Sequence, residues 1–311
     1  MNNFAEESNN QSNNKSIQVQ YRQRDSGKII AETIFMEAGL RYLYENPLIL
    51  KIFNLILNHA VICWLHSKWQ DSKGSCKNIE KFAGKYKINL EEIELPISDY
   101  PNFNAFFSRR LRVGARDFKK PENILIAPAD GKIIVYPDLG IINSIPVKGK
   151  HIAIAEILDN TKIANLYQNG SALVIRLSPS DYHRFHFIDD GFALNTRKIK
   201  GKYHSVNPIA LATVPDIYCR NKRVLTEFHS NNSGHIIYIE VGAFCIGTII
   251  QTFVPGKVYK GQEKGYFKYG GSTIILLFET GIIKFDKDLI IDSTNDLEIQ
   301  VKAGDKIGKN C

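Results

Sequence analysis

The sequence is poor in cysteine and has none of the motifs that bind nucleotide phosphates. Its five cysteines are odd in number and include no C-x-x-C pair: Cys63, Cys76, Cys219, Cys245 and Cys311. This pattern argues against a disulfide framework and indicates a reduced, cytosolic compartment. The chain also lacks a P-loop, a dinucleotide-binding glycine fingerprint and any long internal repeat, so the usual sequence signals of nucleotide binding are missing.

No cationic and apolar signal peptide opens the chain. The first residues, MNNFAEESNNQSNNK, are polar and rich in asparagine. We expect residues 1–27 to be a polar, disordered lead, of which residues 1–16 are the asparagine-rich start. Residues 17–35 alternate polar and apolar side chains around Ser26-Gly27, which predicts a short hairpin or lead-in strands.

Acidic residues are in the minority: 32 carboxylates against 40 lysines and arginines give a formal net charge of +8. This balance favours polyanionic partners, either nucleic acid or an anionic membrane, and does not choose between them. With 311 residues and 44% hydrophobic content, the chain can form one large domain or two ordinary ones with a real core.

Residues 28–118 are predicted to form a mainly helical, membrane-facing region. Within it, PLILKIFNLILNHAVICWLH (47–66) is as apolar as a membrane span, but Lys51, Asn54 and Asn58 fall on one helical face. Because a charge and two amides are costly in a bilayer, an amphipathic helix led by Pro47 is the better interpretation. A helix packed on the protein's own core explains the pattern equally well, and one apolar face could serve both purposes beside a lipid-facing site.

Two further helices are predicted before the β-rich part of the chain. One covers Lys77 to Tyr86. The other, in NFNAFFSRRLRVGARDF (102–118), places apolar residues on one face and arginines on the other: Phe103, Phe106, Phe107 and Leu111 against Arg109, Arg110, Arg112 and Arg116. Such a pattern is typical of a surface helix with solvated arginines, which would also suit an anionic lipid headgroup.

From residue 119 to residue 311, short apolar stretches alternate with Gly, Pro and Asp turns. This alternation predicts a β-rich catalytic domain, so the expected fold class is α+β, with a helical membrane-associating region followed by the β-rich part. The stretches ADGKII and VKAGDKIGK resemble the hammerhead hairpins of biotinyl and lipoyl carriers. No attachment lysine occupies the expected turn, so a carrier role has weak support.

Gly270-Gly271-Ser272-Thr273 comes directly before the apolar run IILLFE. A Gly-Ser bond at the mouth of a buried strand can be one that the protein cuts in itself. Attack of the Ser272 hydroxyl on the preceding carbonyl turns the amide into an ester, a step that needs a base and a site for the oxyanion. Gly271 presents that carbonyl without a Cβ and can take unusual backbone angles. Elimination at Ser272 then leaves dehydroalanine, which hydrolyses to a pyruvoyl group.

Four segments, in this order, resemble the phosphatidylserine decarboxylase family: FFSRRLRVGARDF (106–118), APADGKI (127–133), DYHRFHF (181–187) and EKGYFKYGGSTIILLFE (263–279). The resemblance runs from about Ile30 to Lys309 and is closest to the bacterial branch that lacks a transmembrane anchor. Its specificity comes from the whole set, because Asp130-Gly131 alone is usually just a turn.

The resemblance implies roles for four residues. Asp130, His186 and Ser272 match the triad assigned to self-cleavage, with His186 as the base and Asp130 orienting it as in hydrolase triads. His183 matches the position associated with decarboxylation, where it would donate a proton. The same resemblance places the cut between Gly271 and Ser272.

The resemblance also implies the cofactor, substrate and location. Cleavage would give a large subunit, 1–271, and a small subunit, 272–311, which form a heterodimer; further dimerisation stays open. Ser272 would become a covalent pyruvoyl group, the Schiff-base site that draws electrons from the departing carboxylate, with no metal required. Phosphatidylserine would be converted to phosphatidylethanolamine and CO2 by a peripheral protein on the cytoplasmic face of the cell membrane. Its partners would be phosphatidylserine and an anionic membrane surface, with no nucleic acid.

The sequence departs from the family pattern at three positions. Ala127 stands where many members have serine, Ile188 where proline often follows the second histidine, and Gly270 where the best-known motif has leucine. Because the Gly271-Ser272 pair is intact, processing is expected, at a rate that Gly270 could change.

Two other function classes stay open. A serine hydrolase would use the same Asp130, His186 and Ser272 as an ordinary triad, although the G-x-S-x-G elbow is absent. A hammerhead-type carrier or binding module would use its basic face on membranes without any chemistry. Nucleic-acid binding accounts for the positive charge but for none of the four segments.

Overall fold

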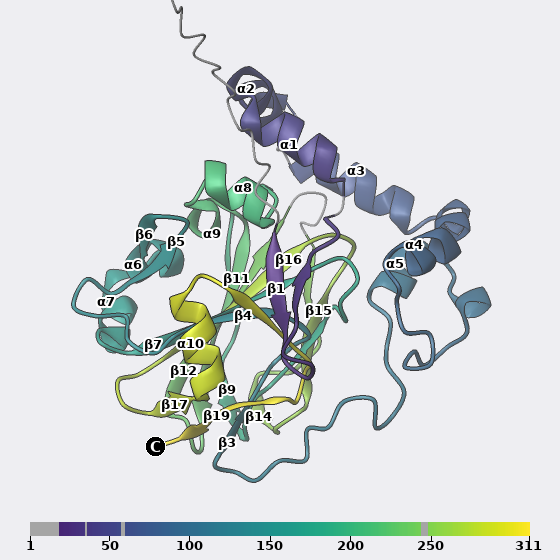
Figure 1. Ribbon diagram of the computed structural model, residues 1–311. Helices are drawn as coiled ribbons and strands as arrows, with labels where there is room; N and C mark the ends of the chain where they lie inside the picture. Colours follow the sequence, from purple (N-terminus) through teal and green to yellow (C-terminus); the bar gives the residue numbers. More distant parts are fainter. Residues whose placement is uncertain (1–18, 35, 57–59, 244–247) are drawn as a thin grey trace, which may run out of the picture.

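The structure, a computed structural model, describes residues 19–34, 36–56, 60–243 and 248–311. Its fold is mixed α+β and mostly β, as predicted, and a large sheet runs through the centre of the molecule (Figure 1). The strands of this sheet are β1 Gln20–Gln23, β2 Ile29–Ala31, β4 Gly131–Tyr136, β7 Ser171–Leu177, β9 Gly191–Ala193, β10 Arg197–Ile199, β11 Arg223–Ser230, β12 His235–Gly242, β14 Gly256–Val258, β16 Ser272–Phe278 and β18 Glu298–Val301. Their order is β14-β9-β11-β12-β16-β7-β4-β18-β1-β2, and β10 pairs with β11 off that path.

Three smaller sheets and several short helices surround the large sheet. The smaller sheets are β13 Ile249–Gln251, β15 Glu263–Phe267 and β8 Arg184–His186; β17 Ile283–Phe285, β19 Lys306–Asn310 and β3 Ile124–Ile126; and β5 Ser144–Val147 with β6 Lys150–Ala153. The α-helices are α1 Glu37–Glu45, α2 Pro47–Ile56, α3 Ala60–Gln70, α4 Ile79–Lys85, α5 Phe103–Phe107, α6 Ile154–Leu158, α7 Thr161–Ala164, α8 Pro208–Thr213, α9 Ile217–Arg220 and α10 Lys287–Thr294. Short 3-10 helices cover Lys73–Asn78, Ile97–Asp99 and Asn165–Tyr167.

The apolar run after the Gly-Ser pair is buried on both sides because β16 lies between two core layers. Successive side chains of a strand point to opposite faces of its sheet. Ile274 and Leu276 pack in one layer with β8, β15 and α10, while Ile275 and Leu277 pack in the other with α6, α8 and α9. Both faces of β16 are therefore excluded from solvent, which explains why its residues are continuously apolar and do not alternate between apolar and polar.

The polar lead is folded where the structure describes it. β1 pairs antiparallel with β2 and parallel with β18, so the predicted hairpin within residues 17–35 is present. Arg22 forms an ion pair with Asp292 of α10, and Arg24 pairs with Asp286 and Asp288. These contacts correct the expectation of disorder for residues 20–27. Residues 1–18 lie outside the described residues.

The apolar segment 47–66 contains α2 and part of α3 in place of one helix, and residues 57–59 between them lie outside the described residues. Phe53 is only 2% exposed and packs near the rings of Tyr44 and His204, which confirms for this side chain the alternative of packing on the protein's own core. Leu48 and Ile52 are 65% and 44% exposed. Within the described ranges, no helix has the length and apolar content needed to cross a bilayer.

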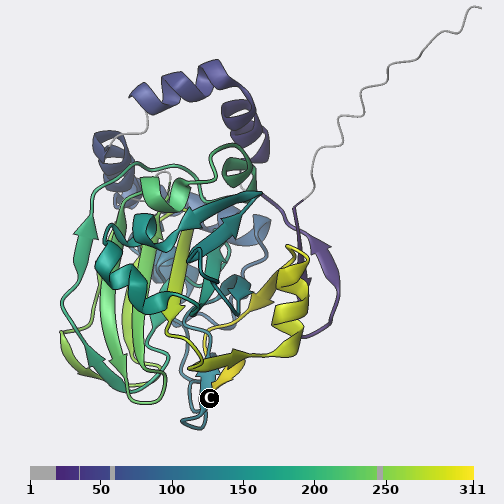
Figure 2. The same ribbon diagram turned by 90° about the vertical axis from the view of Figure 1, so that its left-hand side faces the viewer.

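Helices α1–α3 arch over the end of the large sheet that also carries α8 (Figures 1 and 2). Contacts between α1 and α8 join this arch to the β-rich part of the chain. The helix predicted from Lys77 to Tyr86 is confirmed as α4, with a 3-10 turn before it.

The long amphipathic helix predicted over residues 102–118 is wrong. Only α5 forms, capped at its start by the Asn102 side chain, which accepts a hydrogen bond from the Ala105 N–H. Beyond it, Leu111 forms a β-bridge with Ile93, and Gly114 has φ +90°, a conformation outside any helix. The helix ends at Phe107, followed by the C-cap residue Ser108, and the three phenylalanines of α5 pack into a separate core cluster with α4.

The two stretches that resemble hammerhead hairpins lie close together in the fold. ADGKII (129–134) leads into β4 and covers its first four residues, and VKAGDKIGK spans the end of β18 and most of β19. β4 and β18 are antiparallel neighbours, with Ile133 opposite Ile299, whereas β19 pairs with β3 and β17.

Candidate active site

Ser272 is the first residue of β16, in the middle of the large sheet. Its register partners are Gly242 on β12 and Leu177 on β7. The side chain has no exposed surface, and its Oγ has no hydrogen-bond partner among the described residues. Buried hydroxyls normally find a partner, so an unpaired one calls for an explanation such as a chemical role.

The turn into β16 depends on Gly270 more than on Gly271. Gly270 has φ +129°, a backbone conformation that residues with a Cβ rarely adopt. Gly271 is not in that region, and a Cβ there would meet Val206 Cγ2 at 3.5 Å, an ordinary contact. The unusual backbone angle expected at Gly271 is therefore found one residue earlier, where a leucine would be strained.

His183 lies just before β8 and is completely buried. Its Nε2 donates to the Ser178 carbonyl at 3.1 Å, so Nδ1 carries the lone pair, and this atom has no partner. The ring stacks on Phe107 with 3.9 Å between centroids. Burial holds the pKa of His183 well below its usual range, so the imidazole is neutral at pH 7. Ser178 directly follows Leu177, the register partner of Ser272. The hydrogen bond to the Ser178 carbonyl therefore holds His183 near the predicted cut.

His186 and Asp130 lie in the same neighbourhood. The His186 backbone N–H donates to the carbonyl of Pro128 at 2.8 Å, and its Nδ1 donates to the carbonyl of Gly261 at 3.0 Å. Nε2 therefore carries the lone pair and has no partner. Burial lowers the pKa of His186, while the hydrogen bond to the Gly261 carbonyl and the charges of Glu263 and Asp130 oppose that shift. His186 and Asp130 thus interact electrostatically without a hydrogen bond.

Asp130 is held by Arg116, which the sequence analysis assigned to a lipid-facing helix. Arg116 Nε donates to Asp130 Oδ1 at 2.8 Å, its Nη2 donates to Oδ2, and the Ala303 N–H donates to Oδ1 at 2.9 Å. Glu92 accepts from Arg116 Nη1 at 2.8 Å. Sequence reasoning missed this clamp, and the signal that could have revealed it is Gly114, because a glycine is unfavourable inside a helix.

The four predicted residues form two groups, not one bonded triad. Asp130 and His186 make one group, and His183 lies near Ser272 through the Ser178 carbonyl. Asp130, His186 and Ser272 are all described, and no hydrogen bond joins any two of them. The arrangement that an ordinary serine hydrolase needs is thus not formed here. What the site does contain is two neutral imidazoles, each with an unpaired ring nitrogen.

Two cavities adjoin this region. An apolar cavity of about 320 Å³ is lined by side chains of α1, α2 and α3 and reaches Gly270 and Gly271. A polar cavity of about 490 Å³ contains Asp130 and Arg116 in its wall. The two cavities share four lining residues: Glu32, Thr33, Ser178 and Pro179.

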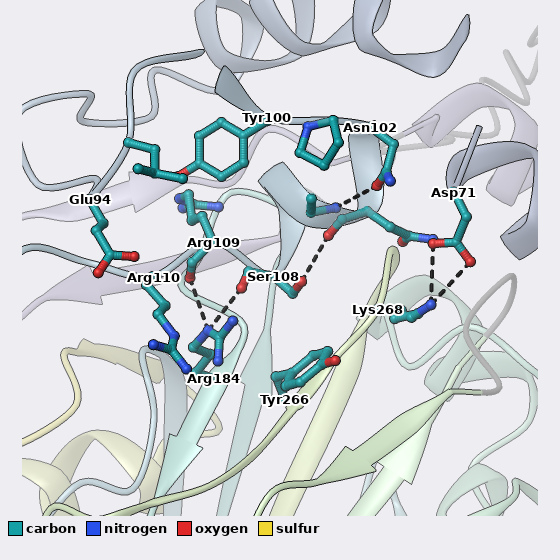
Figure 3. Close-up of a pocket in the computed structure, with 14 residues that line it drawn as sticks. Asp71, Glu94, Tyr100, Asn102, Ser108, Arg109, Arg110, Arg184, Tyr266 and Lys268 are labelled. Atoms are coloured by element: carbon teal, nitrogen blue, oxygen red, sulfur yellow. Dashed lines mark hydrogen bonds and ion pairs between the residues drawn. The ribbon is translucent and has the colours of Figure 1, made fainter. Parts of the chain in front are cut away.

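A third cavity, of about 370 Å³, opens beside α5 and is drawn in Figure 3. Arg109, Arg110 and Arg184 lie on one side of it, and Lys268 pairs with Asp71 at 3.0 Å on the other. Arg109 lines both this cavity and the polar cavity.

The sequence profile of the phosphatidylserine decarboxylase family matches residues 103–309, a span that includes Asp130, His183, His186 and Ser272. The chain belongs to this family. Three similar proteins carry the name phosphatidylserine decarboxylase proenzyme. The one from Clostridium novyi is 46% identical over 270 residues, 86% of this chain and 92% of the relative. Those from Clostridium botulinum strain Hall and Clostridium tetani are 42% and 41% identical, over 93% and 94% of this chain and 99% and 98% of the relatives.

Membership in the phosphatidylserine decarboxylase family confirms the resemblance, the enzyme class and the main function predicted from the four segments. The relatives' designation as proenzymes agrees with a chain that is processed after synthesis. The roles of individual residues stay predictions, and the geometry above bears on how they would act.

Proposed function

We propose that this chain cuts itself between Gly271 and Ser272 and then converts phosphatidylserine to phosphatidylethanolamine and CO2. The observation that carries the proposal is the position of the Gly-Ser bond at the head of a fully buried central strand, where the Ser272 Oγ has no hydrogen-bond partner among the described residues. Family membership supports the reaction. The buried, unpaired hydroxyl supports the place of the cut.

Self-cleavage begins when the Ser272 Oγ attacks the carbonyl carbon of Gly271 and converts the amide into an ester. The family resemblance gives the hydroxyl proton to His186, whose imidazole is neutral at pH 7 and whose Nε2 has no partner among the described residues. Because His186 and Ser272 form no hydrogen bond in this structure, the two side chains must approach each other before the transfer. The proton then passes to the Ser272 nitrogen as its bond to Gly271 breaks. Removal of the Ser272 Cα proton then breaks the Cβ–O bond, which frees Gly271 as a carboxylate and leaves dehydroalanine. Water displaces the nitrogen of dehydroalanine as ammonia, and the new N-terminus is a pyruvoyl group.

Asp130 supports this step through charge, not through a direct hydrogen bond. Its carboxylate is held by Arg116 and the Ala303 N–H, and its charge favours the protonated form of His186. When His186 accepts the proton from Ser272, the nearby negative charge stabilises the imidazolium.

Ser272 is suited to become the pyruvoyl group because it is buried between β12 and β7 and its Oγ has no hydrogen-bond partner among the described residues. The pyruvoyl group supplies a ketone that accepts electrons from the breaking bond between Cα and the carboxylate of the substrate. His183 is anchored by the Ser178 carbonyl and leaves Nδ1 free to carry a proton to that Cα. Because Ser272 is fully buried in the central sheet, water is kept away from the reacting atoms.

We further propose that the enzyme works as a peripheral protein on the cytoplasmic face of the cell membrane. Helices α1–α3 line the apolar cavity that reaches Gly270 and Gly271. Leu48, Leu65 and Trp69 on α2 and α3 are 65%, 53% and 49% exposed. These apolar side chains and the net charge of +8 suit an anionic lipid surface, and free thiols at Cys76, Cys219 and Cys311 suit a reduced compartment.

Intact mass spectrometry under denaturing conditions tests the proposed function. We expect two polypeptides, 1–271 and 272–311, and a hydrazine reagent should add mass only to the smaller one. Ser272→Ala should remain one chain and form no phosphatidylethanolamine from phosphatidylserine vesicles.

Ser171→Ala is the matched control, because Ser171 is a buried serine at the other end of the β7–β16 pairing. This variant should be cut normally. An intact wild-type chain that decarboxylates the lipid would refute the proposal, and labelling of that intact chain by a fluorophosphonate would point to a serine hydrolase.

A further inference from the structure

Arg109 is a buried cation that has no anionic partner among the described residues. Its side chain is 4% exposed. The Nε and Nη1 atoms of its guanidinium are buried without a hydrogen-bond partner. A buried charge without a partner is costly, so its presence points to a partner that the chain itself does not provide.

The Arg109 guanidinium is nevertheless fixed in place. Nη2 donates to the carbonyl oxygens of Ser180 at 3.0 Å and Asp181 at 3.3 Å. The ring of Phe106 lies 5.5 Å from the guanidinium carbon, within the range of a cation–π contact. Because the guanidinium is a rigid planar fork, anchoring Nη2 also sets the directions of the two unpaired nitrogens.

Arg109 lies in the wall of the polar cavity, which has six cationic side chains against four carboxylates. That cavity shares part of its wall with the apolar cavity at Gly270 and Gly271. Ser180, whose carbonyl binds Arg109, follows the register partner of Ser272 by three residues, a reach of at most about 11 Å. A ligand with an anionic head beside an apolar chain would match the two adjoining cavities and the predicted cut.

We propose that Arg109 binds the phosphodiester of the lipid substrate in the polar cavity. This inference rests on the proposed function, because it assigns one group of that substrate to one residue. The apolar part of the lipid then extends into the cavity formed by α1–α3.

The phosphodiester suits Arg109 better than the serine carboxylate does. The carboxylate must lose its charge as CO2 departs, so a buried cation that binds it would stabilise the ground state and slow the reaction. The phosphodiester keeps its charge throughout. Binding it therefore lowers KM without opposing the chemical step.

Three of the five other cations that line the polar cavity, Arg116, Lys132 and Lys302, are already ion-paired, and the remaining two, Lys85 and Lys87, are exposed to solvent. Arg116 binds Asp130 and Glu92. Arg184 pairs with Glu263 at 2.7 Å, and Lys268 pairs with Asp71, as Figure 3 shows for the latter. A ligand anion would have to compete for these groups, whereas the free nitrogens of Arg109 gain their first partner.

The first test uses uncut Ser272→Ala protein, so it does not depend on the reaction. The ¹⁵Nε–¹H signal of Arg109, assigned by its loss in a Ser272→Ala/Arg109→Lys protein, should shift on titration with a serine butyl phosphodiester. A serine alkyl ether of equal length, which lacks the phosphate, should not shift it. An equal response to inorganic phosphate would show a general anion site and overturn the assignment to the substrate.

The second test compares turnover of the same two compounds by the mature enzyme. Arg109→Gln should lower kcat/KM for the phosphodiester by about 100-fold, through KM, as expected for loss of a buried charge contact. The ether should change by less than about 3-fold, and Arg109→Lys should fall in between. Arg112→Gln, on an exposed arginine of the same segment that lines none of the three cavities, is the control and should match the wild type.

The outcomes separate the two proposals. Equal losses on both compounds would assign Arg109 to the carboxylate or to the fold, and would overturn the phosphodiester site. If Arg109→Gln does not fold, the titration of Arg109 in the Ser272→Ala protein decides alone. A wild-type chain that decarboxylates neither compound nor phosphatidylserine would refute the proposed function, while the titration would still report on the site.

Discussion

Three donors hold the carboxylate of Asp130: two from Arg116 and one from the Ala303 backbone. The side chains of Arg116 and Asp130 are 7% and 11% exposed, so little solvent screens the pair. Breaking a buried pair by removing one partner leaves the other charge without compensation. Arg116 therefore acts as a positioning residue for Asp130, and through Asp130 for the charge beside His186.

Arg116→Gln is expected to slow self-cleavage at least about 10-fold and to lower the free energy of unfolding by about 3 kcal/mol. The appearance of the fragment 272–311 after refolding measures the first effect, and urea denaturation of Ser272→Ala backgrounds measures the second. Arg116→Lys should recover part of the cleavage rate. Arg112→Gln, on an exposed arginine of the same segment, is the control. A destabilised Arg116→Gln that cuts at the wild-type rate would reduce Arg116 to a structural role.

For single residues, the sequence indicates the chemistry of a side chain more readily than the residues that it contacts in the fold. Ser272 was identified because a Gly-Ser pair before a buried strand has a specific chemistry, and its burial is confirmed. Arg109 and Arg116 were assigned to an outer helical face because their spacing fits a helix. Their positions in the structure depend on two things. The chain departs from a helix at Gly114, with φ +90°. The arginines then bind carbonyls and carboxylates that are distant in sequence, and these partners cannot be recognised from a local pattern.

Among the elements, α2 combines two surfaces. Phe53 faces the protein and is 2% exposed, while Leu48 and Ile52 are 65% and 44% exposed. Leu48 and Ile52 are four residues apart, so they lie on the same side of the helix. An exposed apolar strip on a helix that also lines the apolar cavity is suited to contact lipid at the entrance to that cavity.

Leu48→Gln/Ile52→Gln is expected to weaken binding to anionic vesicles by about 10-fold or more, because each side chain loses part of the roughly 2 kcal/mol that full burial of an aliphatic group provides. Vesicle flotation at low salt measures the change. Ile291→Gln is the control, since Ile291 is 61% exposed on α10, away from α2 in Figure 1. Equal binding by all three proteins would contradict a lipid contact through α2.

Strands and helices differed in how well the sequence indicated them. The run IILLF and several other short apolar stretches after Pro121 form strands, because apolar runs between turn residues are strong local signals, whereas residues 154–158 and 208–213 form the helices α6 and α8. The helix expected over residues 102–118 ends with α5; beyond it, Leu111 forms a β-bridge with Ile93 and Gly114 has φ +90°, which the helical spacing does not reveal. Which strand pairs with which, including β1 with β18, depends on contacts between distant segments and had no signal in the sequence.

Over the whole molecule, the proposed cut leaves the two products interlocked. β16 of the small subunit lies between β12 and β7 of the large one, and β18 lies between β4 and β1. Along β16, all residues from Ser272 to Phe278 are buried. Backbone ladders on both sides and two apolar layers hold the small subunit, and neither depends on ion pairs that salt screens.

The two subunits are therefore expected to stay together after processing. They should co-elute in size-exclusion chromatography in about 1 M salt, where surface charge interactions are screened, and separate only in denaturant. The uncut Ser272→Ala chain is the control for elution volume. A free fragment 272–311 under native conditions would contradict this account of the sheet.

The parallel pairing of β1 with β18 affects when the sheet can be completed during synthesis of the chain. During translation, β1 leaves the ribosome early and has no neighbour on that side until almost the whole polypeptide has been synthesised. The strand that carries Ser272 also emerges late, after both of its own neighbours. The framework for the proposed cut is thus complete only near the end of synthesis, when the Ala303 N–H that donates to Asp130 has also been made.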